Sequence, residues 1–219
     1  MQYKAAIFDL DGTLIDSLAD LADSANEMLA SYGFPTHPIE PFRYFVGNGS
    51  RKLIERCLPA SKQGDTAFVT EALEKYKACY EKNLLHKTRP YDGIQEMLQA
   101  LQQKSIPLGI CTNKHQSAAT AIVDKLFPAG PFMDNIGARD GLPPNPPPQK
   151  ALLFAAPRGV KPEEVAYFGD TSVDMDTAKN AGFLSVGVTW GFRPKEELEE
   201  HGAKVLLDHP QELFEKISF

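Results

Sequence analysis

Two aspartates, Asp9 and Asp11, have the type and spacing expected of a catalytic or metal-binding pair. They follow a short apolar run at residues 5–8, which predicts a buried strand that delivers both carboxylates to a turn. Side chains two residues apart share a face of a strand, and Gly12 gives the backbone freedom to leave the sheet, so the two acids converge. Crowded carboxylates indicate a divalent cation or a shared proton; the alternative is a solvated Asp-x-Asp-Gly turn without chemistry.

Further polar residues follow other predicted strands. The segment 112–114 comes after one apolar run, and Asp170 and Asp174 come after another. Ligands of open α/β sheets bind at the carboxyl ends of the strands, so these side chains are expected near Asp9. Oxygen ligands from Asp9 and Asp170 favour a small hard cation such as Mg²⁺, bound together with a substrate phosphate. For Asp170 or Asp174 taken alone, capping of the following helix is a plausible alternative.

Composition narrows the class of partner. The chain has 219 residues, 42% of them hydrophobic, a formal net charge of −6 and a pI near 5.4. These values predict a packed core and argue against binding to nucleic acid or to an anionic membrane, and they favour a small-molecule ligand. The three cysteines lack metal-ligand spacing, which indicates reduced thiols. No run is apolar and long enough for a secretory leader or a membrane span, so we expect a cytoplasmic protein.

The apolar segments that must position these residues alternate with helical patterns along the chain. This alternation predicts an α/β fold with a Rossmann-like parallel sheet covered by helices on both faces. The expected strands are residues 5–8, 106–111, 165–168, 185–189 and 204–207.

An insertion separates the first two expected strands by almost a hundred residues, far more than one crossover needs. Its patterns are helical, so we predict a helical cap domain at residues 17–89 and a core domain formed by residues 1–16 plus 90–219. The hinges are expected near residues 16–17 and 89–91, where a cap residue and a proline interrupt the pattern. A mobile lid over the Asp9 turn follows, with a rigidly fused helical domain as the alternative.

The ordered set of motifs resembles the haloacid dehalogenase (HAD) superfamily of phosphotransferases over the whole chain. The residues that carry the resemblance are Asp9-x-Asp11-x-Thr13, Thr112 and Gly169-Asp170-x-x-x-Asp174. Residues 188–193 resemble phosphoglycolate phosphatase-like members. The resemblance implies the HAD fold and phosphate monoester chemistry, and Thr13 favours a phosphatase over β-phosphoglucomutase-like members, which usually carry valine there.

The resemblance also implies the mechanism. Asp9 attacks phosphorus and forms an aspartyl phosphate, and Asp11 protonates the leaving alkoxide and later deprotonates the attacking water. Mg²⁺ is expected on Asp9, the Asp11 carbonyl and Asp170. Asp174 is expected to orient water on the cation or Lys114.

The phosphate and the rest of the substrate are expected to contact the remaining residues of these loops. Thr112 holds phosphate oxygens together with nearby backbone N–H groups. Gly12, Asn113 and Lys114 are predicted to bind the substrate. In the cap, Arg51 opens a predicted helix after a glycine-rich loop and is our candidate reader of an anionic group, with a solvated arginine as the alternative.

One position departs from the family pattern. The superfamily's lysine before Pro-x-Pro is replaced by Asn145, which cannot supply charge to the phosphate. Lys150, about one helical turn further on, and Lys114 are the candidates to replace it, although exposed surface is the ordinary place for a lysine.

These observations predict a Mg²⁺-dependent phosphatase that hydrolyses a small phosphate monoester, such as 2-phosphoglycolate. Two alternatives stay open. Asn145 favours a phosphate-binding or regulatory protein with little turnover, and a sugar-phosphate mutase would use the same aspartyl phosphate. The sequence does not define the physiological substrate or the oligomeric state.

Overall fold

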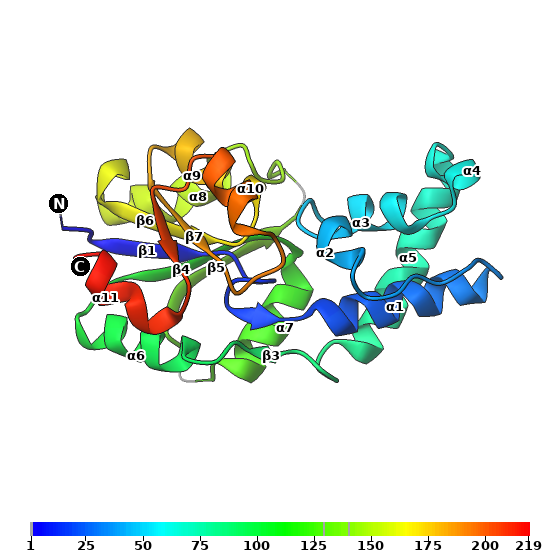
Figure 1. The fold of residues 1–219 in the computed structure, drawn as a ribbon, viewed down its shortest axis with the longest axis horizontal. Helices are drawn as coiled ribbons and strands as arrows, with labels where there is room; N and C mark the ends of the chain where they lie inside the picture. The colour runs from blue at the N-terminus through cyan, green and yellow to red at the C-terminus, as the bar shows by residue number, and fades with distance from the viewer. Residues whose placement is uncertain (1, 129, 140) are drawn as a thin grey trace. The chain divides into compact units, whose positions relative to one another are not determined.

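The first strand lies in the middle of a six-stranded parallel sheet with the order β5-β4-β1-β6-β7-β8 (Figure 1). The computed structural model describes residues 2–128, 130–139 and 141–219. The chain divides into two units, one of Met1–Asp16 and Pro90–Phe219, which holds this sheet, and one of Ser17–Arg89. The strands of the sheet are β1 (Ala5–Phe8), β4 (Leu108–His115), β5 (Phe132–Ala138), β6 (Val165–Gly169), β7 (Leu184–Val188) and β8 (Val205–Leu207).

The register of the sheet places three strand ends side by side. Phe8 of β1 pairs with Ile110 of β4 on one side and with Phe168 of β6 on the other. All four residues of β1 are buried, as expected for a central strand of a parallel sheet that is covered on both faces. The residues that follow β1 and β6, and the last residues of β4, therefore share one edge of the sheet.

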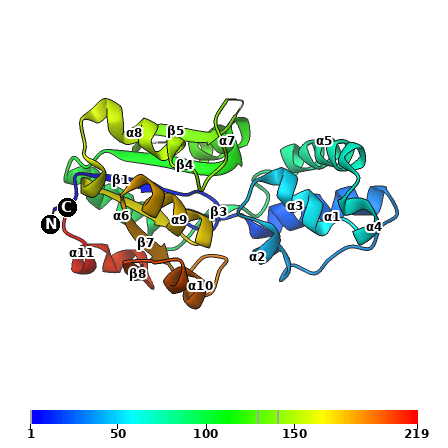
Figure 2. The same cartoon turned by 90° about the horizontal axis from the view of Figure 1, so that it is seen from above.

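Helices cover both faces of the sheet, as the two views in Figures 1 and 2 show, with α8, α9 and α10 on one face and α6, α7 and α11 on the other. Side chains of β1, β4 and β6 pack against α8 and α9 in one buried cluster that includes Ile7, Phe154 and Ala178. The helices are α6 (Ile94–Gln103), α7 (Gln116–Leu126), α8 (Gln149–Ala155), α9 (Ser172–Ala181), α10 (Lys195–Glu200) and α11 (Leu213–Lys216), with 3₁₀ turns η1 (Ala156–Arg158), η2 (Pro162–Glu164) and η3 (Pro210–Glu212).

The smaller unit is helical. Its elements are α1 (Leu18–Ser31), α2 (Phe42–Phe45), α3 (Ser50–Cys57), α4 (Ala60–Gln63) and α5 (Thr66–Asn83). The chain enters and leaves it through two short strands that pair with each other, β2 (Ile15–Asp16) and β3 (Arg89–Pro90). Inside the unit, the buried carboxylate of Asp20 accepts hydrogen bonds from the backbone N–H groups of Lys87 and Thr88, at 2.8 to 3.0 Å, and from the Thr88 hydroxyl at 2.7 Å. This carboxylate fastens the beginning of the unit to its end.

The predicted fold class is confirmed, and each of the five predicted strands is present. The strand predicted at residues 106–111 continues to His115, so Thr112, Asn113 and Lys114 are the last part of β4 and do not follow it as predicted. Strand β5 is not predicted from the sequence, because Asp134, Asn135 and Gly137 break its apolar pattern and because it lies at the edge of the sheet. Among the described residues, no helix combines the length and the apolar character needed to cross a membrane.

Candidate active site

Three carboxylates meet at the carboxyl ends of β1 and β6. Asp9 follows β1, Asp170 follows β6, and Asp174 lies in the first turn of α9; one oxygen of each lies within 4.8 Å of the others. Asp170 and Asp174 are buried, and Asp9 is half-buried. Oxygen donors crowded at this spacing in a buried place suit a small hard cation, which would offset their mutual repulsion.

The crowding changes the acidity of all three groups. Loss of water around the carboxylate, followed by the charges of Asp174 and Asp11, raises the pKa of Asp9 well above its usual range. Burial and the neighbouring Asp9 raise the pKa of Asp170 to about 7. Burial and the charge of Asp170 raise the pKa of Asp174 to about 7. Without a cation, the cluster therefore holds protons near neutral pH.

Asp170 is held on both oxygens. The Thr13 hydroxyl donates to Oδ1 at 3.1 Å, and the Phe192 backbone N–H donates to Oδ2 at 2.7 Å. Gly12 adopts a φ of +87°, and a Cβ at this position would lie 2.2 Å from an Asp170 oxygen. The turn after β1 can therefore approach Asp170 only because residue 12 is a glycine.

Asp174 has a structural role within α9 as well. Its Oδ2 accepts hydrogen bonds from the backbone N–H of Thr171 at 3.1 Å and from the Thr171 hydroxyl at 2.7 Å, which completes a capping box. Asp174 thus caps α9, as the alternative predicts, and also lies beside Asp9 and Asp170. The structure brings together Asp9, Asp170 and Asp174 by their side chains.

The Asp11 carboxylate forms an ion pair with Lys114. Lys114 Nζ donates to its two oxygens at 2.9 and 3.0 Å, and the Lys114 side chain is 5% exposed and the Asp11 side chain 12% exposed. Thr112 makes a side-chain hydrogen bond to Asp9, and its hydroxyl oxygen also accepts from the Lys114 backbone N–H at 3.2 Å. The end of β4 therefore contacts both aspartates of the first motif.

Lys150 lies fully buried in α8. Its Nζ donates to the Thr112 carbonyl and to Asn113 Oδ1, at 2.8 Å each. The surface alternative for this lysine is wrong. Burial lowers the pKa of Lys150, while the charges of Cys111 and Asp9 act in the opposite direction.

Asn145 is buried and shares a hydrogen-bond acceptor with Lys150. Its backbone N–H donates to Asn113 Oδ1 at 2.8 Å, so Asn113 receives both this group and Lys150. The Asn145 side chain donates to Tyr167 Oη at 3.3 Å, and Tyr167 in turn donates to the Cys111 carbonyl at 2.9 Å. Asn145 thus supplies hydrogen bonds without charge at the position where the resemblance noted in the sequence implies a lysine.

Arg51 lies in the helical unit, where it is exposed in the first turn of α3. It pairs with Glu55 at 3.5 Å and donates to the Thr70 hydroxyl at 3.2 Å. These contacts lie within its own unit, and its predicted contact with substrate stays a prediction.

The hydrogen bonds that Asp170 accepts from Thr13 and Phe192 are not predicted from the sequence, although Thr13 belongs to the first motif, and neither is the part played by Tyr167. The Phe192 donor is a backbone group, for which the residue type gives no signal. In the sequence, Tyr167 is typical of a buried strand. Only the structure shows that its hydroxyl accepts a hydrogen bond from Asn145 and donates one to the Cys111 carbonyl in β4.

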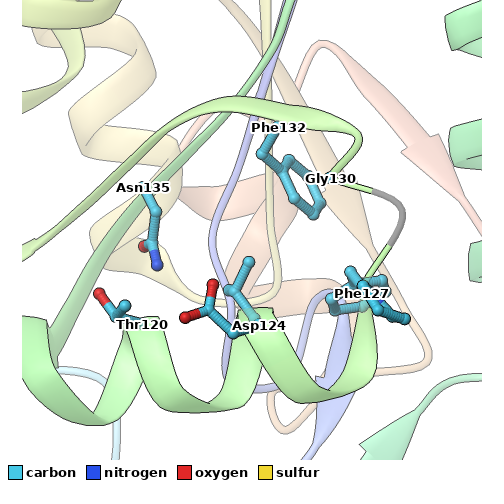
Figure 3. Close-up of a pocket in the computed structure, with 8 residues that line it drawn as sticks. Thr120, Asp124, Phe127, Gly130, Phe132 and Asn135 are labelled. Atoms are coloured by element: carbon cyan, nitrogen blue, oxygen red, sulfur yellow. The ribbon is translucent and has the colours of Figure 1, made fainter.

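A separate pocket of about 400 Å³ lies between α7 and β5, lined by Phe127, Phe132 and Asn135 among others (Figure 3). None of the predicted site residues lines it. The chemistry of the carboxylate cluster therefore does not involve this pocket.

Comparison with known proteins places this geometry in context. The haloacid dehalogenase-like hydrolase family matches residues 6–188. A phosphoglycolate phosphatase from Pseudomonas putida is 32% identical over 94% of this chain and 76% of its own length. An N-acetylmuramic acid 6-phosphate phosphatase from Pseudomonas aeruginosa is 30% identical over 98% of this chain and 95% of its own. The crystal structure of a predicted phosphoglycolate phosphatase from Haemophilus somnus is 26% identical, with a TM-score of 0.90 and 98% coverage of each chain.

Proposed function

The chain belongs to the haloacid dehalogenase-like hydrolase family, and on this premise we propose that it is a Mg²⁺-dependent phosphatase acting through an aspartyl phosphate on Asp9. The observation that carries the proposal is the convergence of Asp9, Asp170 and Asp174 at one edge of the sheet. Phosphatase relatives at about one-third identity support the reaction class.

Asp9 and Asp11 share the chemistry. An Asp9 oxygen bonds to phosphorus while the bond from phosphorus to the ester oxygen breaks, and Asp11 gives its proton to the departing alkoxide. Asp11 then takes a proton from the water that attacks phosphorus, which releases inorganic phosphate and restores Asp9. Lys114 holds both Asp11 oxygens before substrate binds, so this ion pair has to loosen when Asp11 carries a proton.

The residues present fit a bound Mg²⁺. Asp9 and Asp170 would hold it with the Asp11 carbonyl, and the neighbouring Asp174 would orient its water or Lys114. When bound, the ion neutralises negative charge between nucleophile and phosphate. Thr112 holds phosphate oxygens beside Asp9, with Gly12 in the turn after β1 and Asn113 next to Thr112 in β4.

We assign the missing positive charge to Lys150. Its Nζ is held at the end of β4 by Thr112 and Asn113, and the charge of Asp9 acts on it. A buried cation at this place can stabilise the charge that develops on the phosphoryl group. The lysine of the superfamily has in this view moved by five positions along the chain, from 145 to 150.

The proposed substrate is a small anionic phosphate monoester of the 2-phosphoglycolate type, because relatives with this name cover nearly the whole chain. Residues 17–89 would act as the cap that selects it, with Arg51 reading its carboxylate. N-Acetylmuramic acid 6-phosphate is the competing substrate suggested by a relative of similar identity. The two substrates are compared by kcat/KM, and Arg51→Ala should raise KM for 2-phosphoglycolate without raising KM for an aryl phosphate.

The proposed compartment is the cytoplasm, because Cys57, Cys79 and Cys111 are all free and buried.

The decisive test of the reaction is phosphate release from 2-phosphoglycolate and from para-nitrophenyl phosphate, with Mg²⁺ and with chelator. We expect activity that requires Mg²⁺ and that falls by at least about a thousandfold in Asp9→Asn, because the nucleophile is lost. Asp124→Asn, which changes an exposed aspartate of α7, is the matched control and should keep full activity. Activity that survives Asp9→Asn would refute the mechanism.

A phosphate-binding protein with little turnover is the second candidate, favoured by the uncharged Asn145. It predicts binding of inorganic phosphate without catalysis, and a large gain of turnover in Asn145→Lys. Little change in Asn145→Lys, combined with loss of turnover when Lys150 is replaced, identifies the relocated lysine instead.

A further inference from the structure

The segment Trp190–Arg193, which follows β7, is tied to the turn after β1 and to Asp170. Trp190 Nε1 donates to the Thr13 carbonyl at 3.0 Å. The Phe192 backbone N–H donates to one Asp170 oxygen at 2.7 Å, and the Thr13 hydroxyl donates to the other at 3.1 Å. One donor to Asp170 lies in residues 190–193 and the other in the turn after β1, and the hydrogen bond from Trp190 to Thr13 links these two stretches.

Gly191 makes this close approach possible. A Cβ at position 191 would lie 2.2 Å from Asp170 Cβ, 2.4 Å from the Gly12 carbonyl oxygen and 2.6 Å from Asp170 Oδ2. Side chains in folded proteins almost never show such distances, and the obstructing atoms are a backbone carbonyl and a short buried side chain. Any larger residue must therefore displace either the segment or Asp170.

The segment also connects to the helix that follows Asp170. Arg193 is buried, and its guanidinium acts to lower the pKa of Asp170 against the effect of burial. Arg193 pairs with Glu197 at 3.4 Å, and Glu197 accepts a hydrogen bond from the Ser172 backbone N–H at 3.1 Å. The segment therefore contacts Asp170 through the Phe192 N–H and is joined through Arg193 and Glu197 to Ser172, the first residue of α9.

We propose that Trp190–Arg193 is a positioning segment that sets the Asp170 carboxylate for cation binding, with Gly191 as the residue on which this depends. The proposal rests on the proposed function, in which Asp170 is a ligand of Mg²⁺. Partners that orient a metal ligand typically contribute roughly 10- to 100-fold to metal affinity.

The test measures metal binding and needs no turnover. Free Mn²⁺, which prefers the same oxygen ligands, is counted by electron paramagnetic resonance in solutions of the wild-type protein and its variants. We expect Gly191→Ala to weaken Mn²⁺ binding at least tenfold. Trp190→Phe keeps an aromatic, although smaller, side chain but removes the donor to Thr13, and should weaken binding about fivefold, the value of one hydrogen bond. Gly64→Ala is the matched control, because residue 64 has a negative φ and open space around it.

A second readout comes from the wild type alone. Trp190 is the only tryptophan in the chain, so its fluorescence reports on this segment directly. We expect a change in emission when Mg²⁺ is added, with a midpoint that matches the Mg²⁺ affinity obtained by competition against Mn²⁺, and no change in Asp170→Asn.

The outcomes separate the two proposals. A wild-type protein that binds no Mn²⁺ contradicts the cation site and this inference with it. Wild-type binding that Gly191→Ala and Trp190→Phe leave unchanged overturns the positioning segment only. If Gly191→Ala does not fold, as judged by circular dichroism, Trp190→Phe and the wild-type fluorescence decide the question.

Discussion

Lys150 is a residue whose possible role can be predicted from the sequence but whose burial and contacts are known only from the structure. Its position one turn past Asn145 suggested a replacement cation, but sequence left surface exposure as an equal alternative. Burial and the two acceptors at 2.8 Å remove that alternative. Asn145 itself was noticed only as a missing charge, whereas its backbone N–H and side chain join Asn113 and Tyr167 in one buried network.

Replacement of Lys150 by methionine tests the role of its charge. Methionine keeps most of the volume in the buried space, so the loss of turnover should reflect the cation. We expect kcat to fall about a hundredfold, since a lost preorganised cation costs about 3 kcal/mol at a developing phosphoryl charge. Steady-state kinetics on para-nitrophenyl phosphate measure this. Lys125→Met, on the exposed surface of α7, serves as control; a Lys150→Met enzyme within threefold of wild type would show that the charge is not used.

A helix or strand could be predicted from the sequence where its apolar residues repeat with a single clear period. The buried strand predicted at residues 5–8 and the helical pattern predicted for residues 17–89 are both present, as β1 and as the helices α1 to α5. Strand β5 is not predicted because polar residues interrupt its apolar pattern. The contact between Phe192 and Asp170 is not predicted because it joins residues 22 positions apart through a backbone donor. Periodicity carries no information on such contacts.

At the level of elements, Asp20 fastens α1 to the segment that leaves the helical unit. Removing its carboxylate in Asp20→Ala leaves three buried or half-buried donors on Lys87 and Thr88 without an acceptor. We expect the free energy of unfolding to fall by about 3 kcal/mol, measured by chemical denaturation. Asp23→Ala removes an exposed partner of the same Lys87 and should cost less than about 1 kcal/mol. Equal losses in the two variants would contradict the role assigned to Asp20.

The whole molecule should respond to pH through the carboxylate cluster. Burial raises the pKa values of Asp170 and Asp174 to about 7, with a further contribution from Asp9 at Asp170 and from Asp170 at Asp174, whereas unfolded aspartates titrate near pH 4. Between these values the unfolded chain holds fewer protons than the folded one, so the stability contributed by these groups is lost as pH rises.

We therefore expect the metal-free protein to lose stability from about pH 4 to pH 7 through these groups, and Mg²⁺ to restore more stability at pH 8 than at pH 5.5. Thermal denaturation with chelator and with Mg²⁺ at both pH values measures the difference. Asp170→Asn should reduce it. A Mg²⁺ effect that is equal at both pH values would show that the cluster does not bind the ion with loss of protons.

Family membership and the phosphatase class, both expected from the motif order, are confirmed by the comparisons at the scale of the chain. The assignment of chemistry to Asp9 and Asp11 is a proposal that one experiment tests most directly. In Asp11→Asn, para-nitrophenolate leaves without needing a proton, whereas the attacking water has lost its base. We expect one equivalent of nitrophenolate per enzyme, released in a burst, followed by almost no turnover, with the phosphate found on residue 9 after acid quench and peptide mapping. Turnover without a burst, or phosphate on any other residue, would contradict the account.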